Sequence, residues 1–78
     1  MIEIKRRPDG EWEAVEGQVQ RPGRGECFVI LPVTDVIRDM IRFAKDREVQ
    51  VRIDGVEAKR AIAAGPRSDN TVKLTVIP

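Results

Sequence analysis

The dipeptide Asp54-Gly55 limits what this chain can fold into more than any other local feature. Apolar and polar side chains alternate over residues 49–53 before it, and residues 56–63 follow it as a returning strand. An aspartate-glycine pair in this position predicts a two-residue β-hairpin, because both central residues of such a turn need a positive φ. The register then puts Arg52 opposite Glu57, which is a favourable cross-strand pair of opposite charges.

Three strands are predicted before this hairpin, over residues 2–6, 11–20 and 26–31. The turn Pro8-Asp9-Gly10 separates the first two, because proline presets φ and glycine accepts a positive φ. In the second strand the apolar side chains change parity near Val15, and Gly17 predicts a bulge there. The third strand is apolar at five consecutive positions, which is typical of a strand covered on both faces.

One helix is predicted over residues 35–46. Thr34 is placed to cap it, and Asp35 lies in the first turn, where the helix dipole favours a negative charge. A last strand is predicted over residues 71–77, where apolar and polar side chains alternate again. The helix has an apolar stripe at helical spacing, made of Val36, Ile37, Met40, Ile41 and Ala44.

The predicted order is therefore βββαβββ in one α+β domain over residues 1–78. A single helix cannot form repeated βαβ units, so we expect a mostly antiparallel sheet. Short strands with bulge signals predict a strongly curved sheet or a half-open small barrel. The residues expected to be buried in the core are Phe28, Ile30, Ile37, Met40, Ile41, Val51, Ile53 and Leu74.

Four stretches together resemble a known family pattern. They are Trp12-Glu13-Ala14, Pro22-Gly23-Arg24-Gly25, Phe28-Val29-Ile30-Leu31-Pro32 and the stretch from Val49 through Gly55 to Val56. This arrangement resembles a small bacterial β-barrel domain of unknown function that is found in proteins related to the bacteriocin-protection family. The resemblance implies a compact barrel-like fold, and it assigns no functional residue.

The side chains that commonly carry out catalysis are scarce. The chain has no histidine and no tyrosine, so the commonest acid–base group is missing. Cys27 lies in an apolar run, where a core residue is expected, and Ser68 lies among turn-forming residues. The glutamates of residues 11–16 are a candidate carboxylate pair, but a solvated strand face explains them better. We therefore expect no enzymatic activity, no metal site and no cofactor.

Cys27 is the only cysteine, so it cannot form an intramolecular disulfide. The first residues do not have the pattern of a signal peptide, and the longest apolar run, residues 27–33, is too short to span a bilayer. These features predict a cytoplasmic protein that does not bind membranes.

Basic side chains are the candidate binding residues. Lys and Arg number 14 against 13 Asp and Glu, so a nucleic-acid site would have to be a local patch. The loop at residues 21–25 is a candidate phosphate cradle, and one side of the helix is a candidate nucleic-acid surface. Plain solvated surface is the alternative in both places. The residues concerned are Arg21 and Arg24 in the loop, and Arg38, Arg42 and Lys45 on the helix.

Arg60 and Trp12 are harder to interpret. The hairpin register puts Arg60 on the apolar side of its strand, where an unpaired charge would be costly. Three interpretations remain open: a bulge turns Arg60 outward, a carboxylate pairs with it, or it faces a partner. Trp12, the only tryptophan, is either a core anchor or an interface residue.

The resulting hypothesis is a non-enzymatic small interaction module that binds a protein partner as a homodimer. Such compact chains are often accessory proteins of phages or mobile elements. The alternative is a nucleic-acid-binding protein that uses the local basic residues. We expect the dimer to form through the last strand, the helix or both, because Lys73 is the only charge that would deter pairing at an exposed strand edge over residues 71–77.

Overall fold

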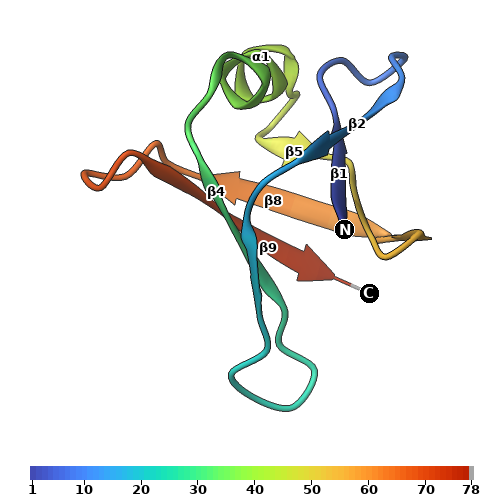
Figure 1. Ribbon diagram of the computed structural model, residues 1–78, viewed down its shortest axis with the longest axis vertical. Coiled ribbons are helices and arrows are strands. Elements are labelled where there is room, and N and C mark those ends of the chain that lie inside the picture. Colours follow the sequence, from blue (N-terminus) through green and yellow to red (C-terminus); the bar gives the residue numbers. More distant parts are fainter. Residues whose placement is uncertain (78) are drawn as a thin grey trace.

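The computed structural model describes residues 1–77, which form two antiparallel sheets and one helix (Figure 1). The four-stranded sheet has the order β2 (Trp12–Val15), β1 (Ile2–Lys5), β6 (Val51–Ile53), β7 (Val56–Glu57). The five-stranded sheet has the order β3 (Gln18–Gln20), β4 (Phe28–Pro32), β9 (Thr71–Ile77), β8 (Arg60–Ala64), β5 (Glu48–Val49). The predicted α+β class with antiparallel pairing and one helix is therefore confirmed.

The helix α1 (Asp35–Phe43) begins at the predicted residue and ends three residues early. The hydroxyl of Thr34 accepts a hydrogen bond from the backbone N–H of Ile37 at 3.4 Å, as expected of an N-cap. The early end has a backbone cause: the C-cap residue Ala44 is extended, with φ −71° and ψ 138°, and Asp46 and Arg47 after it have positive φ, at 54° and 59°. These two residues turn the chain back into β5.

Three of the predicted strands each divide between the two sheets. Residues 11–20 become β2 and β3, residues 49–53 fall in β5 and β6, and residues 56–63 fall in β7 and β8. At the first division, a Cβ on Gly17 would lie 2.6 Å from Leu31 Cδ2 and 2.7 Å from the carbonyl oxygen of Ile30. The glycine predicted to form a bulge is therefore the residue at which this strand passes from one sheet to the other.

The hairpin predicted at Asp54-Gly55 is confirmed. Both turn residues have positive φ, at 50° and 83°. Arg52 is paired in register with Glu57, as predicted. Its ion pair, however, is made with Glu3 on β1, at 2.8 Å. The hairpin is thus tied to the first strand by a side-chain pair across the four-stranded sheet.

The core lies between the two sheets and under α1. Of the predicted core residues, four are buried: Ile37, Met40, Val51 and Leu74. The prediction is wrong for the other four, which are only half-buried: Phe28, Ile30, Ile41 and Ile53.

Strand alternation explains the error in β4. Val29 and Leu31 point into the core and are completely buried. Phe28 and Ile30 therefore point to the opposite, outer face of the five-stranded sheet. There the ammonium of Lys73 lies 4.0 Å from the centre of the Phe28 ring. An uninterrupted apolar run indicated a strand covered on both faces, but Phe28 and Ile30 stay half-buried on this outer face.

The last strand is not at a sheet edge, which corrects the expectation of an exposed edge there, while the expected route to a dimer through the helix stays a prediction. β9 is hydrogen-bonded to β4 on one side and to β8 on the other, and β3 and β5 form the edges of this sheet. Long strands with a continuous apolar face gain most from the centre of a sheet, and β9 is the longest strand described. Pairing of two chains through this strand would require the sheet to open.

Candidate functional site

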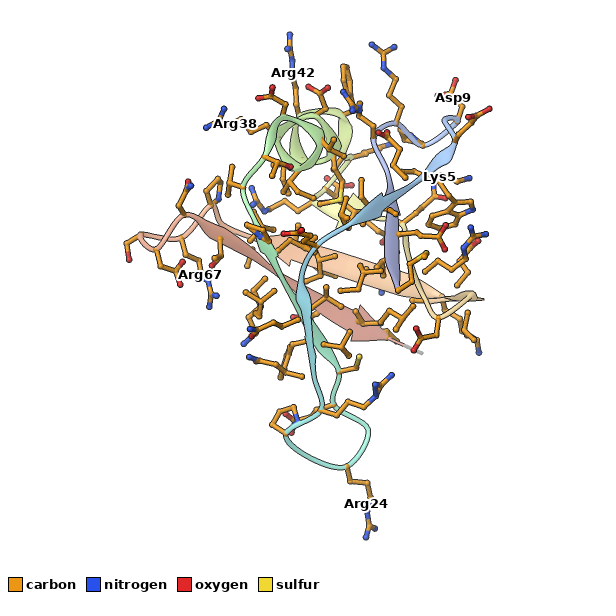
Figure 2. The ribbon with its side chains drawn as sticks, in the orientation of Figure 1. Lys5, Asp9, Arg24, Arg38, Arg42 and Arg67 are labelled. Atoms are coloured by element: carbon orange, nitrogen blue, oxygen red, sulfur yellow. The ribbon has the colours of Figure 1, made fainter. Side chains whose placement is uncertain are left out.

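The candidate basic residues do not form one patch. Figure 2 shows Arg24 at one end of the molecule and Arg38 and Arg42 at the other. These ends lie along the longest axis, over which the chain extends 31 Å. The loop at residues 21–25 and the helix are therefore two separate surfaces, and each has an apolar hollow beside it.

The first surface is a hollow of about 520 Å³ between the loop after β3 and the β6–β7 hairpin, which we call the hairpin hollow. Its size lies within the range of small-molecule pockets. Next to its apolar floor, Val56 is 71% exposed, which is unusual for a valine. The residues around the hollow are Arg21, Gly23, Gly25, Glu26, Cys27, Ile53, Asp54, Val56, Glu57, Ala58 and Val76.

Charges of both signs surround the hairpin hollow. Arg21 contributes a positive charge, and Glu26, Asp54 and Glu57 contribute negative charges. The pKa of Asp54 lies below its ordinary value, because its carboxylate accepts a hydrogen bond from the Met1 ammonium and is attracted by that charge and by Arg21. Asp54 therefore stays negatively charged to lower pH than an isolated aspartate.

Cys27 contributes a half-buried free thiol to the wall of the hairpin hollow. Its backbone carbonyl accepts a hydrogen bond from the N–H of Val76 at 2.9 Å, which ties the start of β4 to β9. The residue is neither fully buried, as expected of a core cysteine, nor beside a histidine, which the chain lacks.

The second surface is a smaller hollow of about 170 Å³ between α1 and β9, which we call the helix hollow. Its walls are apolar, and Arg38 and Arg42 stand at its rim. Figure 2 shows both arginines pointing away from the body of the molecule. The residues around the hollow are Val33, Ile37, Arg38, Ile41, Arg42, Pro66 and Val72.

An aromatic–arginine cluster extends from this rim, and sequence reasoning missed it. The guanidinium carbon of Arg7 lies 4.4 Å from the centre of the Phe43 ring, and that of Arg42 lies 5.7 Å from it. Phe43 was expected to flank the apolar stripe, yet it is 36% exposed. The only local signal is the Arg-Phe pair at the end of the helix, since Arg7 comes from the distant β1–β2 turn.

Lys45 and Arg60 do not join either surface as binding residues. Lys45 is exposed and bridges through its backbone to Glu48. Arg60 is exposed, and its guanidinium makes an ion pair with Glu48 at 3.1 Å. The break between β7 and β8 shifts the parity, so that Ala61 and Ala63 point inward instead. Two of the three interpretations of Arg60 therefore hold together: it is turned outward and it is paired.

Trp12 is not a core anchor, and its use at an interface stays a prediction. It is half-buried on the outer face of the four-stranded sheet. The guanidinium of Arg52 lies 4.6 Å from its ring centre, and the ammonium of Lys5 lies 5.0 Å from one of its rings. Two cations thus cover the indole, which stabilises both the ring and the charges.

An ion pair holds the middle of α1 to the four-stranded sheet. The guanidinium of Arg6 donates two hydrogen bonds to Glu13, at 3.0 and 3.1 Å, and one to Asp39 on α1, at 3.2 Å. These bonds raise the pKa of Arg6. Likewise, the two hydrogen bonds from Arg52 lower the pKa of Glu3. Arg6 and Glu3 are therefore already paired within the fold, and neither is available to a ligand.

Residues 1–77 contain neither a candidate metal site nor a helix that could cross a membrane. They contain no group of three or more cysteine, aspartate or glutamate side chains arranged to hold a metal ion. The nine-residue α1 is also too short to cross a membrane, and no other helix is described.

No protein-family model, curated protein or solved structure matches this chain.

Proposed function

We propose that this protein is a non-enzymatic interaction module that acts as a homodimer and binds a protein partner. The observation that carries the proposal is the hairpin hollow, where an exposed apolar side chain, Val56, stands beside an apolar cavity on one face. A two-fold axis brings the same surface patch of both chains into contact. Val56 of one chain can therefore enter the cavity of the other only if Val56 and the cavity lie side by side on that patch. The hairpin hollow has this arrangement.

The charges around the hollow support the same proposal. Arg21 lies on the same face as Glu26, Asp54 and Glu57, so a two-fold axis can bring the arginine of each chain near a carboxylate of the other. The chain exposes 5142 Å² of surface. A standard interface covers about 800 Å² per partner, and roughly 500 Å² would reach the lower limit for a stable dimer. That limit corresponds to about a tenth of this surface.

Sedimentation at micromolar concentration tests the proposal directly. We expect the wild-type chain to have twice the mass of one chain, and Val56→Glu to be a monomer because it puts a charge in the apolar contact. Thr75→Glu is the matched control, since it adds the same charge at an exposed strand residue of the other sheet. A monomeric wild type, or a Val56→Glu variant that dimerises as well as Thr75→Glu does, would refute the proposal.

We also propose that the two sheets form a half-open small barrel. In support of this, residues 11–20, 48–53 and 56–64 each contribute strands to both sheets. The two sheets share no strand pairing, so a path from β1 around the strands and back to β1 passes from one sheet to the other along the chain in these segments. The resemblance to the small β-barrel domain related to the bacteriocin-protection family is part of the same proposal.

Nucleic-acid binding has less support as a function. It was based on five basic residues acting together, and Arg21 and Arg24 lie at the opposite end from Arg38 and Arg42. A cytoplasmic location also belongs to the proposal, because the single thiol of Cys27 suits a reducing compartment.

A further inference from the structure

The helix hollow is the second place where apolar surface and charge come together, and it lies on another face from the hairpin hollow. Its walls come from three parts of the chain: α1, the segment before it, and β9 with the loop that precedes it. Ile37 and Val72 form buried wall, while Ile41 and Val33 stay half-buried beside the opening. A volume of about 170 Å³ is well above the ~10–15 Å³ that a single water requires, so the hollow has room for a side chain. One leucine-sized side chain fits such a space.

The rim of this hollow has positive charge that the fold does not neutralise. Arg38 and Arg42 are one helical turn apart, and like charges at this spacing repel each other. Asp35 lies 3.6 Å from Arg38, but both side chains are largely exposed, so this pair is weak. In the described part of the chain, neither Arg42 nor Arg7 takes part in an ion pair. An anion at this rim would therefore relieve repulsion as well as gain contacts.

We propose that the helix hollow binds an acidic peptide segment of a partner protein. One aliphatic side chain of the segment occupies the hollow, and carboxylates on either side of it pair with Arg38 and Arg42. Guanidinium groups bind carboxylates through two parallel hydrogen bonds, so two arginines at a fixed spacing select for acidic residues near the anchor. This inference rests on the proposed function as an interaction module, but it does not depend on dimerisation.

The shape of the surface favours a peptide over a nucleic acid. A nucleobase needs a flat aromatic face on which to stack. Phe43, the aromatic residue at this end, already has the guanidinium of Arg7 over its ring at 4.4 Å. The helix hollow itself is bordered by branched aliphatic side chains and a proline, which suit a methyl-bearing side chain better than a planar ring.

Fluorescence anisotropy with a labelled peptide tests the inference. The probe is a capped peptide with one leucine flanked by two aspartates on each side. We expect saturable binding by the wild-type chain. Replacing both rim arginines, Arg38→Gln with Arg42→Gln, should weaken it by about tenfold or more, because charge-assisted hydrogen bonds are strong. A peptide with serine in place of the leucine should also bind at least several-fold more weakly, because the hollow would lose its apolar occupant.

A matched double variant controls for net charge. Arg24→Gln with Lys59→Gln removes two exposed positive charges elsewhere, and it should bind the peptide as the wild type does. The inference is overturned if the wild type does not bind at about 1 mM peptide, an affinity of about −4 kcal/mol. Equal effects of the two double variants also overturn it, since binding would then follow net charge alone. Tighter binding of a single-stranded oligothymidylate, lost with the rim arginines, overturns it in favour of a nucleic acid.

The Val56→Glu variant separates this inference from the dimer proposal. If the dimer proposal is right, the variant sediments as a monomer and still binds the peptide with unchanged affinity. If the dimer proposal fails and the wild type is monomeric, the peptide result stands unaffected. Loss of peptide binding in Val56→Glu while it keeps its circular dichroism would place the site at the hairpin hollow and refute the assignment to the helix hollow.

Discussion

We expect the addition of a single methyl group at Gly17 to lower the stability of the fold by an unusually large amount for so small a change. This residue joins β2 to β3, and it lies against the backbone of β4. In Gly17→Ala, the new Cβ would lie 2.6 Å from Leu31 Cδ2, 2.7 Å from the carbonyl oxygen of Ile30 and 3.2 Å from Ile2 Cδ1. A side-chain end can rotate away, but a carbonyl oxygen in a paired strand cannot move without shifting β4.

The expected cost follows from two opposing effects. Overpacking of this kind costs about 1–3 kcal/mol. Replacing glycine also removes freedom from the unfolded chain, which returns about 0.4–1 kcal/mol. With the middle of each range, we expect a net loss of about 1.3 kcal/mol in the free energy of unfolding. The total for a chain of this length is about 4–12 kcal/mol. The midpoint of thermal unfolding should fall by about 5–10 °C.

Urea unfolding followed by the fluorescence of Trp12 measures this change, because the only tryptophan lies on β2, the strand that leads to the junction. Gly23→Ala is the matched control. Its new Cβ would meet only the flexible Glu26 side chain, at 3.1 Å, so we expect a change within about 0.5 kcal/mol. If Gly17→Ala unfolds within about 0.5 kcal/mol of Gly23→Ala, the close approach at the junction is not the constraint that we describe.

Two further predictions concern the helix and the four-stranded sheet. Ile37→Ala should lower the free energy of unfolding by about 2–5 kcal/mol, because Ile37 is 1% exposed. Ile41→Ala should lower it clearly less, because Ile41 is half-buried. Equal losses of the two variants in urea unfolding would contradict this packing. The pKa of Glu3 is lowered, so its pair with Arg52 stabilises the fold fully above the ordinary value of 4.5, and that contribution is lost as the pH falls below it. Glu3→Gln should therefore lose less stability than the wild type between pH 6 and pH 3, and the exposed Glu16→Gln should behave as the wild type does.

Features with a local cause could be predicted from the sequence. Asp54-Gly55 forms a hairpin turn because the turn depends on its own two residues. Thr34 caps α1 because its hydroxyl reaches an N–H three residues away. The turn at Asp46 and Arg47 has the same positive φ at both residues, yet it contains no glycine, so no signal marks it. Instead, Arg47 donates hydrogen bonds to the carbonyls of Ala63 and Gly65, which holds it in place from a distance.

Features that depend on distant pairing could not be predicted. The position of β9 between β4 and β8 depends on which strands meet, and alternation along residues 71–77 is the same for an edge strand and a central strand. The same limit applies to the candidate site. Sequence reasoning named Arg38 and Arg42, but their hollow also needs Pro66 and Val72. The stacking of Arg7 on Phe43 needs the β1–β2 turn to lie against the end of α1.

The three segments that pass from one sheet to the other also determine how this molecule unfolds. Because each segment has one half in each sheet, neither sheet can separate as an independent unit without breaking the pairing of the other. Native-state hydrogen exchange should then give the slowest amides of both sheets, such as those of Ile4 and Leu74, one common opening free energy. Such a chain has no stable partly folded state. A destabilising mutation in either sheet therefore lowers the fraction of fully folded protein and does not produce a partly folded form that keeps some activity.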